Sequence, residues 1–367
     1  MDVVVVGAGV IGLAIARAAA ERDHSVVVLE RERIGAGAST IQPGGVRQQW
    51  GTAIACRLAR ESVAFWRDAG DRLASPVPLE LRRSGYLFVA LGEETLARLT
   101  ANVRVQNAEG VPSRIVSPEE AARLVPGLAA AELAGGAWCD EDGYFDRPQS
   151  VVEAFAAGLD VRIHAVESLT PAGDGWLVGC SDGVRLAADQ VVVAAGADTV
   201  GLLEPLGIAL PIEPEERYLF LSEPVPERLL EPLVVSPELA FAAKQLADGR
   251  VLASDLSARG AAAVDREEWR THVRAVVERL LPRLTYVSYP LLVRGVYDVT
   301  PDRQPVLGPV SPGLHVAAGF SGHGFMIAPA VARIVVDALE GDRDALLDAL
   351  GADRFAAGRL VPEPQLV

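Results

Sequence analysis

The opening of the chain constrains the fold more than any other stretch of its 367 residues. The apolar run Asp2–Val6 is typical of a strand buried on both faces of a parallel sheet, and Val10–Arg22 carries apolar residues at helical spacing. At their junction stand Gly7, Gly9 and Gly12. In a G-x-G-x-x-G turn the first glycine permits the tight turn, the second lets the backbone approach a pyrophosphate, and the third packs the helix on the strand. The sequence therefore predicts a doubly wound α/β fold that binds a dinucleotide.

The second predicted strand, Ser25–Glu30, ends in a carboxylate 18 residues beyond Gly12. At this place a glutamate can accept hydrogen bonds from both ribose hydroxyls of an adenosine. A loop rich in small residues, Gly35–Gly51, follows in place of another regular strand and helix. The run 191–196 (VVVAAG) resembles the later flavoprotein strand whose glycine end passes near the same dinucleotide. Both features favour FAD over NAD.

The other segments are of two kinds. Buried parallel-type segments lie at the start, middle and end of the chain, the last of them being Leu314–Ala318, and a helix is predicted over Pro329–Leu339. Antiparallel segments such as Arg217–Ser222 and Arg250–Ser254 lie between them. The cofactor domain is therefore predicted to be discontinuous. We expect a cofactor domain of residues 1–83, 145–210 and 298–367, and a substrate domain of residues 84–144 and 211–297.

Composition disfavours several classes of partner. The formal charge of −15, with no Lys/Arg-rich run to offset it, repels polyanions, so neither nucleic acid nor an anionic membrane surface is expected. No uninterrupted apolar stretch of about 18 residues predicts a membrane span. Cys56, Cys139 and Cys180 lack the spacing of a zinc site or a disulfide framework. We expect a cytoplasmic protein that holds no metal and acts on a small molecule.

Five stretches carry a resemblance to a known family: DVVVVGAGVIG, ASTIQPGGVRQQWG, VVVAAGAD, GVYDVTPDRQPVLGP and GLHVAAGFSGHGFMIAPAVAR. Together, and in order over the whole chain, they resemble the D-amino acid oxidase (DAO) superfamily of flavoproteins. They are most similar to its sarcosine oxidase and dehydrogenase branch, which includes the β-subunits of heteromeric sarcosine and proline dehydrogenases. The resemblance implies an α/β fold with a Rossmann-like, glutathione-reductase-type FAD domain and an α+β substrate domain built on an antiparallel sheet. It also implies hydride transfer from a substrate carbon to flavin N5, giving an imine that hydrolyses.

The resemblance bears on three positions at the substrate. Arg47, in GGVRQQWG, matches the arginine that pairs with the substrate carboxylate in the sarcosine oxidase branch, and a guanidinium suits this task because its fork is bidentate and always charged. A surface ion pair is the alternative reading of Arg47. Tyr297, in GVYDVT, matches the sarcosine-type tyrosine, whereas D-amino acid and glycine oxidases carry arginine there. Met326 stands where monomeric sarcosine oxidases have a lysine as second carboxylate anchor, which leaves room for a bulkier or less polar substrate.

By the same resemblance, residues 322–326 run along the pyrimidine edge of the flavin. Backbone N–H groups and the helix dipole would there stabilise negative charge on the reduced ring. His323 would touch flavin or substrate, or would only brace its loop. A G-x-S-x-G nucleophile turn would need glycine at position 323. The expected FAD contacts are Gly7, Gly9, Val10, Ile11, Gly12, Glu30, Arg31, Ser39, Thr40, Gly44, Gly45, Val46, Val166, Ala195, Gly196, Gly322, His323, Gly324, Phe325 and Met326.

Lys244 is the only lysine in a chain with 33 arginines, since Lys and Arg together number 34. An ammonium near flavin N5 would stabilise superoxide during reaction with O2, so Lys244 is a catalytic candidate, with an ordinary surface lysine as the alternative. The positions used for covalent flavin attachment in relatives fall on Gly295 and near Gln42. Neither position can form the bond, so FAD is expected to be non-covalent.

We therefore expect an FAD-dependent oxidoreductase that oxidises the C–N bond of a secondary amine or amino acid of the sarcosine, N-methyl amino acid or proline type, with O2 as acceptor and release of H2O2. A dehydrogenase subunit that passes electrons to a partner subunit is an open alternative, as is glycine or D-amino acid oxidase-like activity. Two other classes are a hydrolase using Ser321 and His323, which point poorly at each other across one glycine, and a nucleotide-binding subunit without catalysis.

Overall fold

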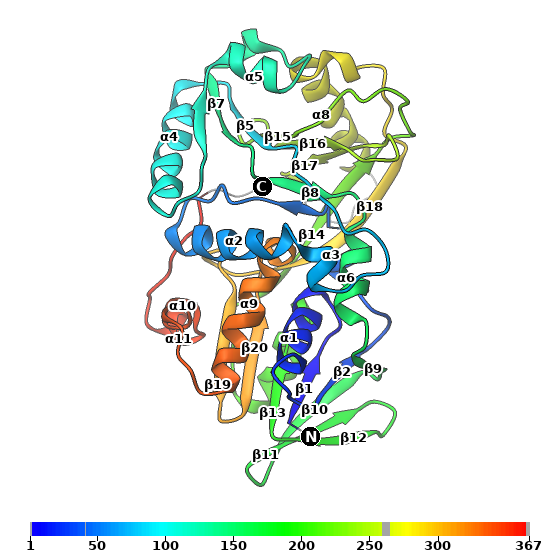
Figure 1. Cartoon of the computed structure of the whole chain (residues 1–367), viewed down its shortest axis with the longest axis vertical. Helices are drawn as coiled ribbons and strands as arrows, with labels where there is room; N and C mark the ends of the chain where they lie inside the picture. The colour runs from blue at the N-terminus through cyan, green and yellow to red at the C-terminus, as the bar shows by residue number, and fades with distance from the viewer. Residues whose placement is uncertain (1, 41, 259–264, 365–367) are drawn as a thin grey trace.

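The structure is a computed structural model that describes residues 2–40, 42–258 and 265–364, with the side chains of Thr40 and Asp265 outside this description. A six-stranded sheet forms the part of the molecule that carries the N-terminus (Figure 1). Its central strand pairs in parallel on both sides, with Val4 opposite Val27 and Val191. In spatial order the strands are β19 (Val306–Ser311), β20 (Leu314–Ala318), β13 (Gln190–Val193), β1 (Val3–Val6), β2 (Val26–Glu30) and β9 (Asp160–Ile163).

Both faces of this sheet are covered, which explains why its central strand consists of valines alone. Val3 and Val5 pack against helices, while Val4 and Val6 pack against a three-stranded meander. A strand buried on both faces has no polar side, so the sequence shows no alternation there. The helices are α1 (Val10–Ala20), α2 (Ala53–Trp66), α6 (Pro148–Ala156) and α9 (Gly324–Leu339), and the meander is β10 (Val166–Ala172), β11 (Gly175–Cys180) and β12 (Arg185–Ala188).

An eight-stranded sheet forms the other part of the molecule (Figure 1). Its neighbouring strands are antiparallel except for β5 and β15, which run parallel with Leu87 opposite Val234. In spatial order the strands are β18 (Leu291–Val299), β14 (Glu213–Leu221), β17 (Val251–Asp255), β16 (Phe241–Gln245), β15 (Leu233–Ser236), β5 (Tyr86–Ala90), β7 (Gly135–Cys139) and β6 (Arg114–Val116). The helices of this part are α4 (Glu93–Ala108), α5 (Pro118–Leu124) and α8 (Asp265–Leu280).

The two sheets meet at a short third sheet and at α2, which crosses the waist of the molecule (Figure 1). The third sheet is formed by β3 (Gly45–Val46), β8 (Gly143–Phe145) and β4 (Leu81–Arg82). The remaining short helices are α3 (Ala69–Arg72), α7 (Thr199–Leu203), α10 (Ala345–Leu350) and α11 (Asp353–Ala356). The predicted fold class is confirmed, because a largely parallel α/β sheet and a largely antiparallel sheet are combined and segments far apart in the sequence share each sheet.

One predicted boundary is wrong: α9 begins at Gly324 rather than at Pro329, which lies inside the helix. A proline there removes the backbone donor that the carbonyl of Phe325 would use, and this usually breaks a helix. Side chains of α2 support the interrupted turn. The indole N–H of Trp66 donates to the carbonyl of Met326 at 2.8 Å, and Ser62 Oγ accepts from the N–H of Ala330 at 3.2 Å. The helix therefore reaches the loop that carries His323.

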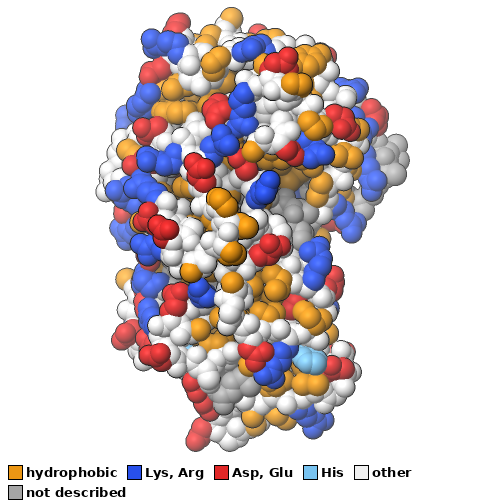
Figure 2. Space-filling model, turned by 45° about the vertical axis from the view of Figure 1, so that its right-hand side comes forward, with side chains coloured by type: hydrophobic (Ala, Val, Ile, Leu, Met, Phe, Trp, Pro, Cys, Tyr) orange, Lys and Arg blue, Asp and Glu red, His pale blue; other side chains and the backbone are white. Residues whose placement is uncertain are grey.

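Charges of both signs are interspersed over the face of the molecule shown in Figure 2. None of the helices in the described ranges is both long and apolar enough to cross a lipid bilayer.

Candidate active site

The glycine turn has the geometry that its sequence predicts. Gly7 adopts φ = 107°, and a Cβ on it would come within 2.4 Å of the carbonyl oxygen of Ala194. A Cβ on Gly12 would lie 2.0 Å from the carbonyl oxygen of Gly7. A Cβ on Gly9, by contrast, would meet nothing closer than Ser39 Oγ at 3.4 Å. The first and third glycines therefore allow close backbone packing, while the second keeps the cavity side of the turn open.

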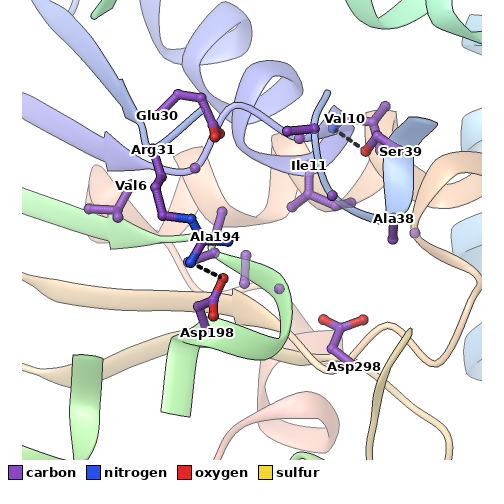
Figure 3. A pocket seen from close by; sticks show the side chains of 18 of the residues that line it. Val6, Val10, Ile11, Glu30, Arg31, Ala38, Ser39, Ala194, Asp198 and Asp298 are labelled. Atoms are coloured by element: carbon purple, nitrogen blue, oxygen red, sulfur yellow. Dashed lines mark hydrogen bonds and ion pairs between the residues drawn. The ribbon is translucent and has the colours of Figure 1, made fainter. Parts of the chain in front are cut away.

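A cavity of about 410 Å³ begins at this turn (Figure 3). Glu30 is oriented at its edge, because its carboxylate accepts from the N–H groups of Ala8 at 2.8 Å and Glu32 at 2.9 Å. Ser39 Oγ accepts from the N–H of Val10 at 3.0 Å, which joins the small-residue loop to the start of α1. The predicted cofactor residues that line this cavity are Gly7, Gly9, Val10, Ile11, Glu30, Arg31, Ser39, Val166, Ala195, Gly196, Gly322, Gly324 and Phe325.

The other predicted cofactor residues lie elsewhere. Gly44 and Val46 line neither cavity and instead build the turn around β3, where a Cβ on Gly44 would come within 2.4 Å of the carbonyl oxygen of Phe145. Gly12 packs against the turn as described above. The side chain of Thr40 lies outside the described part of the chain. Gly45, His323 and Met326 line a second, smaller cavity rather than the first.

This second cavity, of about 100 Å³, lies under the eight-stranded sheet. Residues of β18, β14, β17, β16, β15 and β5 form its roof on the side of the sheet, and the loop around residue 323 lines it from the other side. Four residues, Gln42, Tyr297, Gly322 and Phe325, line both cavities. The small cavity therefore adjoins the large one along this border.

Arg47 lies in the small cavity and is 2% exposed, so the surface ion-pair reading is wrong. Its Nη1 donates to the carbonyl of Gln49 at 2.7 Å, and its guanidinium carbon lies 3.6 Å from the ring centroid of Trp50. Burial lowers the pKa of Arg47 to about 10, partly offset by neighbouring acidic groups, so the guanidinium keeps its charge at neutral pH.

Two buried carboxylates hold the turn that carries Arg47. Asp142 accepts from the backbone N–H of Gln48 at 2.8 Å and from Nε2 of Gln49 at 3.2 Å, and burial raises its pKa to about 6. Glu363, brought in from the far end of the sequence, accepts from the N–H of Gly51 and from Thr52 Oγ1, each at 2.7 Å. The arginine is thus fixed from both sides of its turn.

His323 is 7% exposed, and its ring lies edge-on to Trp50 with the centroids 4.2 Å apart. Burial, reinforced by the positive charges of Arg47 and Arg303, lowers the pKa of His323 well below its usual value, so the imidazole is neutral at pH 7. Its buried Nε2 has no hydrogen-bond partner among the described residues. A buried polar atom left in this way is costly unless another molecule supplies its partner.

Tyr297 borders both cavities at the end of β18. It presses against the 319–322 turn so closely that a Cβ on Gly322 would lie 2.3 Å from its ring. Asp298 holds this turn by accepting from the N–H of Gly319 at 2.7 Å, and Ser321 Oγ contacts the backbone N–H of Thr300 at 3.3 Å. Asp298 thus stabilises the turn, and it also lines the larger cavity (Figure 3). The hydrogen bonds of the Ser321 hydroxyl therefore stabilise the turn.

Lys244 is fully buried in the roof of the small cavity, so the surface-lysine reading is wrong. Its Nζ donates to the carbonyl of Pro43 and lies 3.9 Å from the ring centroid of Tyr144. Burial lowers its pKa to about 7. The lone lysine therefore titrates near neutrality beside the predicted substrate position.

Arg217, Gln42 and Tyr86 also line the small cavity, and sequence reasoning gave them no role at the substrate. Arg217 is one of many arginines, and only its place opposite Gly295 in the ladder of β14 and β18 singles it out. Gln42 lines both cavities, and its buried Nε2 has no partner among the described residues. Its position within the small-residue loop Gly35–Gly51 is the one feature of the sequence that could have indicated Gln42.

A family model described as DAO, FAD dependent oxidoreductase, matches residues 2–338. The chain belongs to the DAO family. This DAO-family chain is 29% identical over 396 residues to FAD-dependent oxidoreductase domain-containing protein 1 of Bos taurus, covering 93% of the chain and 81% of that protein. It is 29% identical to a glycine oxidase of Pseudomonas aeruginosa, covering 98% and 99%. Among solved structures, L-proline dehydrogenase from P. horikoshii superposes with a TM-score of 0.91 at 26% identity, covering 98% and 99%.

The cavities fit the FAD that DAO-family oxidoreductases use. The open cavity side of Gly9 and the start of α1 make the cradle that a pyrophosphate needs, because the first N–H groups of a helix have no partner within it. Glu30 is already oriented for a ribose by two backbone donors. At the opposite end, α9 directs a second helix N-terminus at residues that border both cavities. The flavoprotein assignment thus agrees with geometry at both ends of the larger cavity.

Proposed function

We propose that this FAD-dependent oxidoreductase oxidises the C–N bond of a secondary amine or amino acid of the sarcosine, N-methyl amino acid or proline type. The observation that carries the proposal is the small cavity, in which a buried guanidinium and an unpartnered imidazole nitrogen lie next to the border with the larger cavity. Arg47 suits a carboxylate, and His323 suits an amine. A substrate held by both would present the carbon between them to the border residues.

Arg47 orients the substrate. Because Gln49 and Trp50 fix its guanidinium before a ligand arrives, little conformational entropy is lost on binding. The cavity is mostly walled by apolar and aromatic groups, which strengthens the charged pair by excluding water. An Arg–carboxylate pair in such a site fixes the direction of the Cα–N bond as well as its place.

His323 favours the reactive form of the amine. Its imidazole stays neutral, so it can accept a hydrogen bond from the substrate nitrogen at Nε2 without adding positive charge beside Arg47. The neutral amine is the form that can release hydride from the adjacent carbon. The two positive groups near His323 disfavour a protonated amine for the same electrostatic reason that they lower the histidine pKa.

The adenosine and pyrophosphate of FAD would be held by Gly7, Gly9, Val10, Ile11, Glu30 and Ser39. The flavin end would be held by Gly322, Gly324 and Phe325. When bound, FAD supplies the hydride acceptor, flavin N5, and the amine becomes an imine that water hydrolyses. The N–H groups at the start of α9 would stabilise negative charge on the reduced ring. Nothing in the proposal requires a covalent link to the chain.

We favour O2 as the electron acceptor because of Lys244. It is buried in the roof of the small cavity and has a pKa of about 7, so an ammonium is available near neutrality to stabilise superoxide before H2O2 leaves. A dehydrogenase that passes electrons to a partner subunit is the alternative. Tyr297 disfavours glycine or D-amino acid oxidase-like activity, because enzymes with those activities resemble each other in carrying arginine at this position.

The test is an anaerobic absorbance titration of the yellow protein with sarcosine, L-proline, glycine and D-alanine, followed by admission of air. We expect a secondary amine to bleach the flavin, and rapid recovery of colour with peroxide to follow. Slow recovery would indicate the dehydrogenase. Bleaching by glycine or D-alanine alone would replace the proposed substrate class, and no bleaching by any amine would refute it. In the same titration, Arg47→Gln should need a higher concentration of a carboxylate substrate to bleach the flavin. The matched control is Arg57→Gln, which changes a surface arginine paired with Glu109.

A further inference from the structure

We propose that Arg217 is a second anion-binding position in the small cavity, so that the preferred substrate is an amino acid carrying a second carboxylate on its side chain or on its nitrogen. The inference rests on the proposed function, because it takes Arg47 as the partner of the first carboxylate. It goes further by naming the substrate class and a residue that determines specificity.

The two arginines approach the cavity from opposite ends of its roof. Arg217 projects from β14, whereas Arg47 lies 5.4 Å from the ring centroid of Phe88 on β5. In the sheet, β17, β16 and β15 stand between β14 and β5, and all three contribute residues to the roof. Four strand spacings of about 4.8 Å separate the strand axes by about 19 Å. Arg217 reaches inward from β14, whereas Arg47 belongs to the turn after β3 and lies near Phe88 at the β5 end. The space between the two guanidinium groups suits a ligand with an anionic group at each end.

Local structure directs Arg217 into the cavity. Residues directly opposite each other in an antiparallel ladder share a face of the sheet, and Arg217 stands opposite Gly295. Because glycine has no side chain, the guanidinium can lie over β18, where its carbon is 5.8 Å from the ring centroid of Tyr297. Tyr297 borders both cavities, so Arg217 lies against a residue of the proposed reaction site.

Among the described residues, the ion pairs around Arg217 join two guanidinium groups to one carboxylate. Glu215 forms ion pairs with both Arg217 and Arg303, so one carboxylate serves two guanidinium groups. Arg217 Nη1 also donates to the carbonyl of Leu256 at 2.9 Å, which fixes the plane of the guanidinium. These two contacts engage only part of a fork with five N–H donors. The arrangement is pre-organised to bind a further acceptor from the cavity side.

A neighbouring arginine provides the contrast. Arg294, on the adjacent strand β18, pairs with Glu216 at 3.1 Å, and its side chain is 56% exposed. The side chain of Arg217 is 18% exposed and contributes to the cavity wall. The two residues are close in the same pair of strands, but only one faces the proposed substrate. Arg294→Gln is therefore a matched control for Arg217→Gln.

The experiment compares ligands with one and two carboxylates on the flavin-loaded protein. Dissociation constants for acetate and succinate come from perturbation of the flavin absorbance, and anaerobic reduction is followed with sarcosine, N-methyl-L-glutamate and iminodiacetate. We expect wild type to bind succinate more tightly than acetate. We expect Arg217→Gln to weaken binding of succinate and of at least one dicarboxylic amine by roughly 10- to 100-fold, as loss of a charged hydrogen-bond partner does, and to change acetate and sarcosine by less than about threefold. Arg294→Gln should behave as wild type.

Two results would overturn the inference while leaving the proposed function intact: sarcosine reduces the flavin but wild type does not prefer dicarboxylates, or Arg217→Gln weakens mono- and dicarboxylates equally. If no amine reduces the flavin, the proposed function fails, and the acetate and succinate constants still decide whether Arg217 binds an anion. Arg217→Lys is the control for misfolding, because lysine keeps the positive charge but lacks the bidentate guanidinium. It should recover part of the preference for succinate.

Discussion

The pKa of Lys244 is open to direct measurement, because this is the only lysine in the chain. The structure buries its ammonium between the carbonyl of Pro43 and the ring of Tyr144, and burial lowers the pKa from 10.5 to about 7. At about 1.4 kcal/mol for each tenfold change in acidity, this corresponds to about 5 kcal/mol. One carbonyl and one aromatic face replace only part of the hydration that the ammonium loses.

The sign of the effect on stability follows from the two pKa values. The unfolded chain keeps the proton up to about pH 10.5, whereas the folded chain keeps it only up to about pH 7. The full penalty of about 5 kcal/mol therefore applies below pH 7, and it falls to about 2 kcal/mol at pH 9. The wild type should accordingly gain stability relative to Lys244→Met as the pH rises from 7 to 9.

The assay labels lysine with ¹³C at Cε, which gives a single side-chain signal without assignment. We expect its shift to titrate near pH 7, and we expect the difference in Tm between wild type and Lys244→Met to change in favour of wild type between pH 7 and pH 9. A midpoint near 10.5 would refute the reasoning, because it would mean that the carbonyl and the ring compensate fully for burial. A Tm difference that is constant over this range would contradict the linkage argument.

Three further predictions concern Arg47, Gly12 and a buried ion pair between Arg354 and Asp302. Arg47→Ala should raise KM for carboxylate substrates by about 100-fold and much less for neutral amines, and steady-state rates with both classes would expose an equal effect. Gly12→Ala would place a Cβ 2.0 Å from the carbonyl oxygen of Gly7, so flavin retention on ultrafiltration should fall at least about tenfold. Arg354→Met leaves the buried carboxylate of Asp302, 2.9 Å from Arg354 Nε, without its ion-pair partner and should lower the free energy of unfolding by about 3–5 kcal/mol. The double variant Arg354→Met/Asp302→Leu should restore the Tm, because it also removes the buried carboxylate.

Local patterns in the sequence were sufficient to predict the nucleotide-binding part of the fold. Gly7 and Gly12 have the steric roles that their spacing indicates, and Glu30 ends the second strand as expected. These features depend on residues within one strand–helix–strand unit. The start of α9 was not predictable in this way, because the partners that support a helix around Pro329 come from α2, more than 260 residues earlier.

The small cavity was predictable only in part, because it is assembled across six strands of the eight-stranded sheet. Arg47 and Tyr297 could be found through a motif. Nothing local distinguishes Arg217 from the other arginines, since its direction depends on the register that sets it opposite Gly295. Burial of Lys244 likewise depends on Pro43 and Tyr144, which belong to other parts of the sequence.

The interleaving of the two sheets has a consequence for synthesis on the ribosome. The carbonyl of Ala194, which packs against the turn at Gly7, is synthesised 187 residues after Gly7. The N-terminus of α9 is synthesised later still. At roughly 5–20 residues per second, about 15–60 s pass between emergence of Gly12 and of Met326. Until β13 emerges, the first helix and its valine strand lack this neighbour, and until β15 emerges, β5 lacks its parallel partner. We therefore expect the nascent chain to bind FAD only after both sheets have closed.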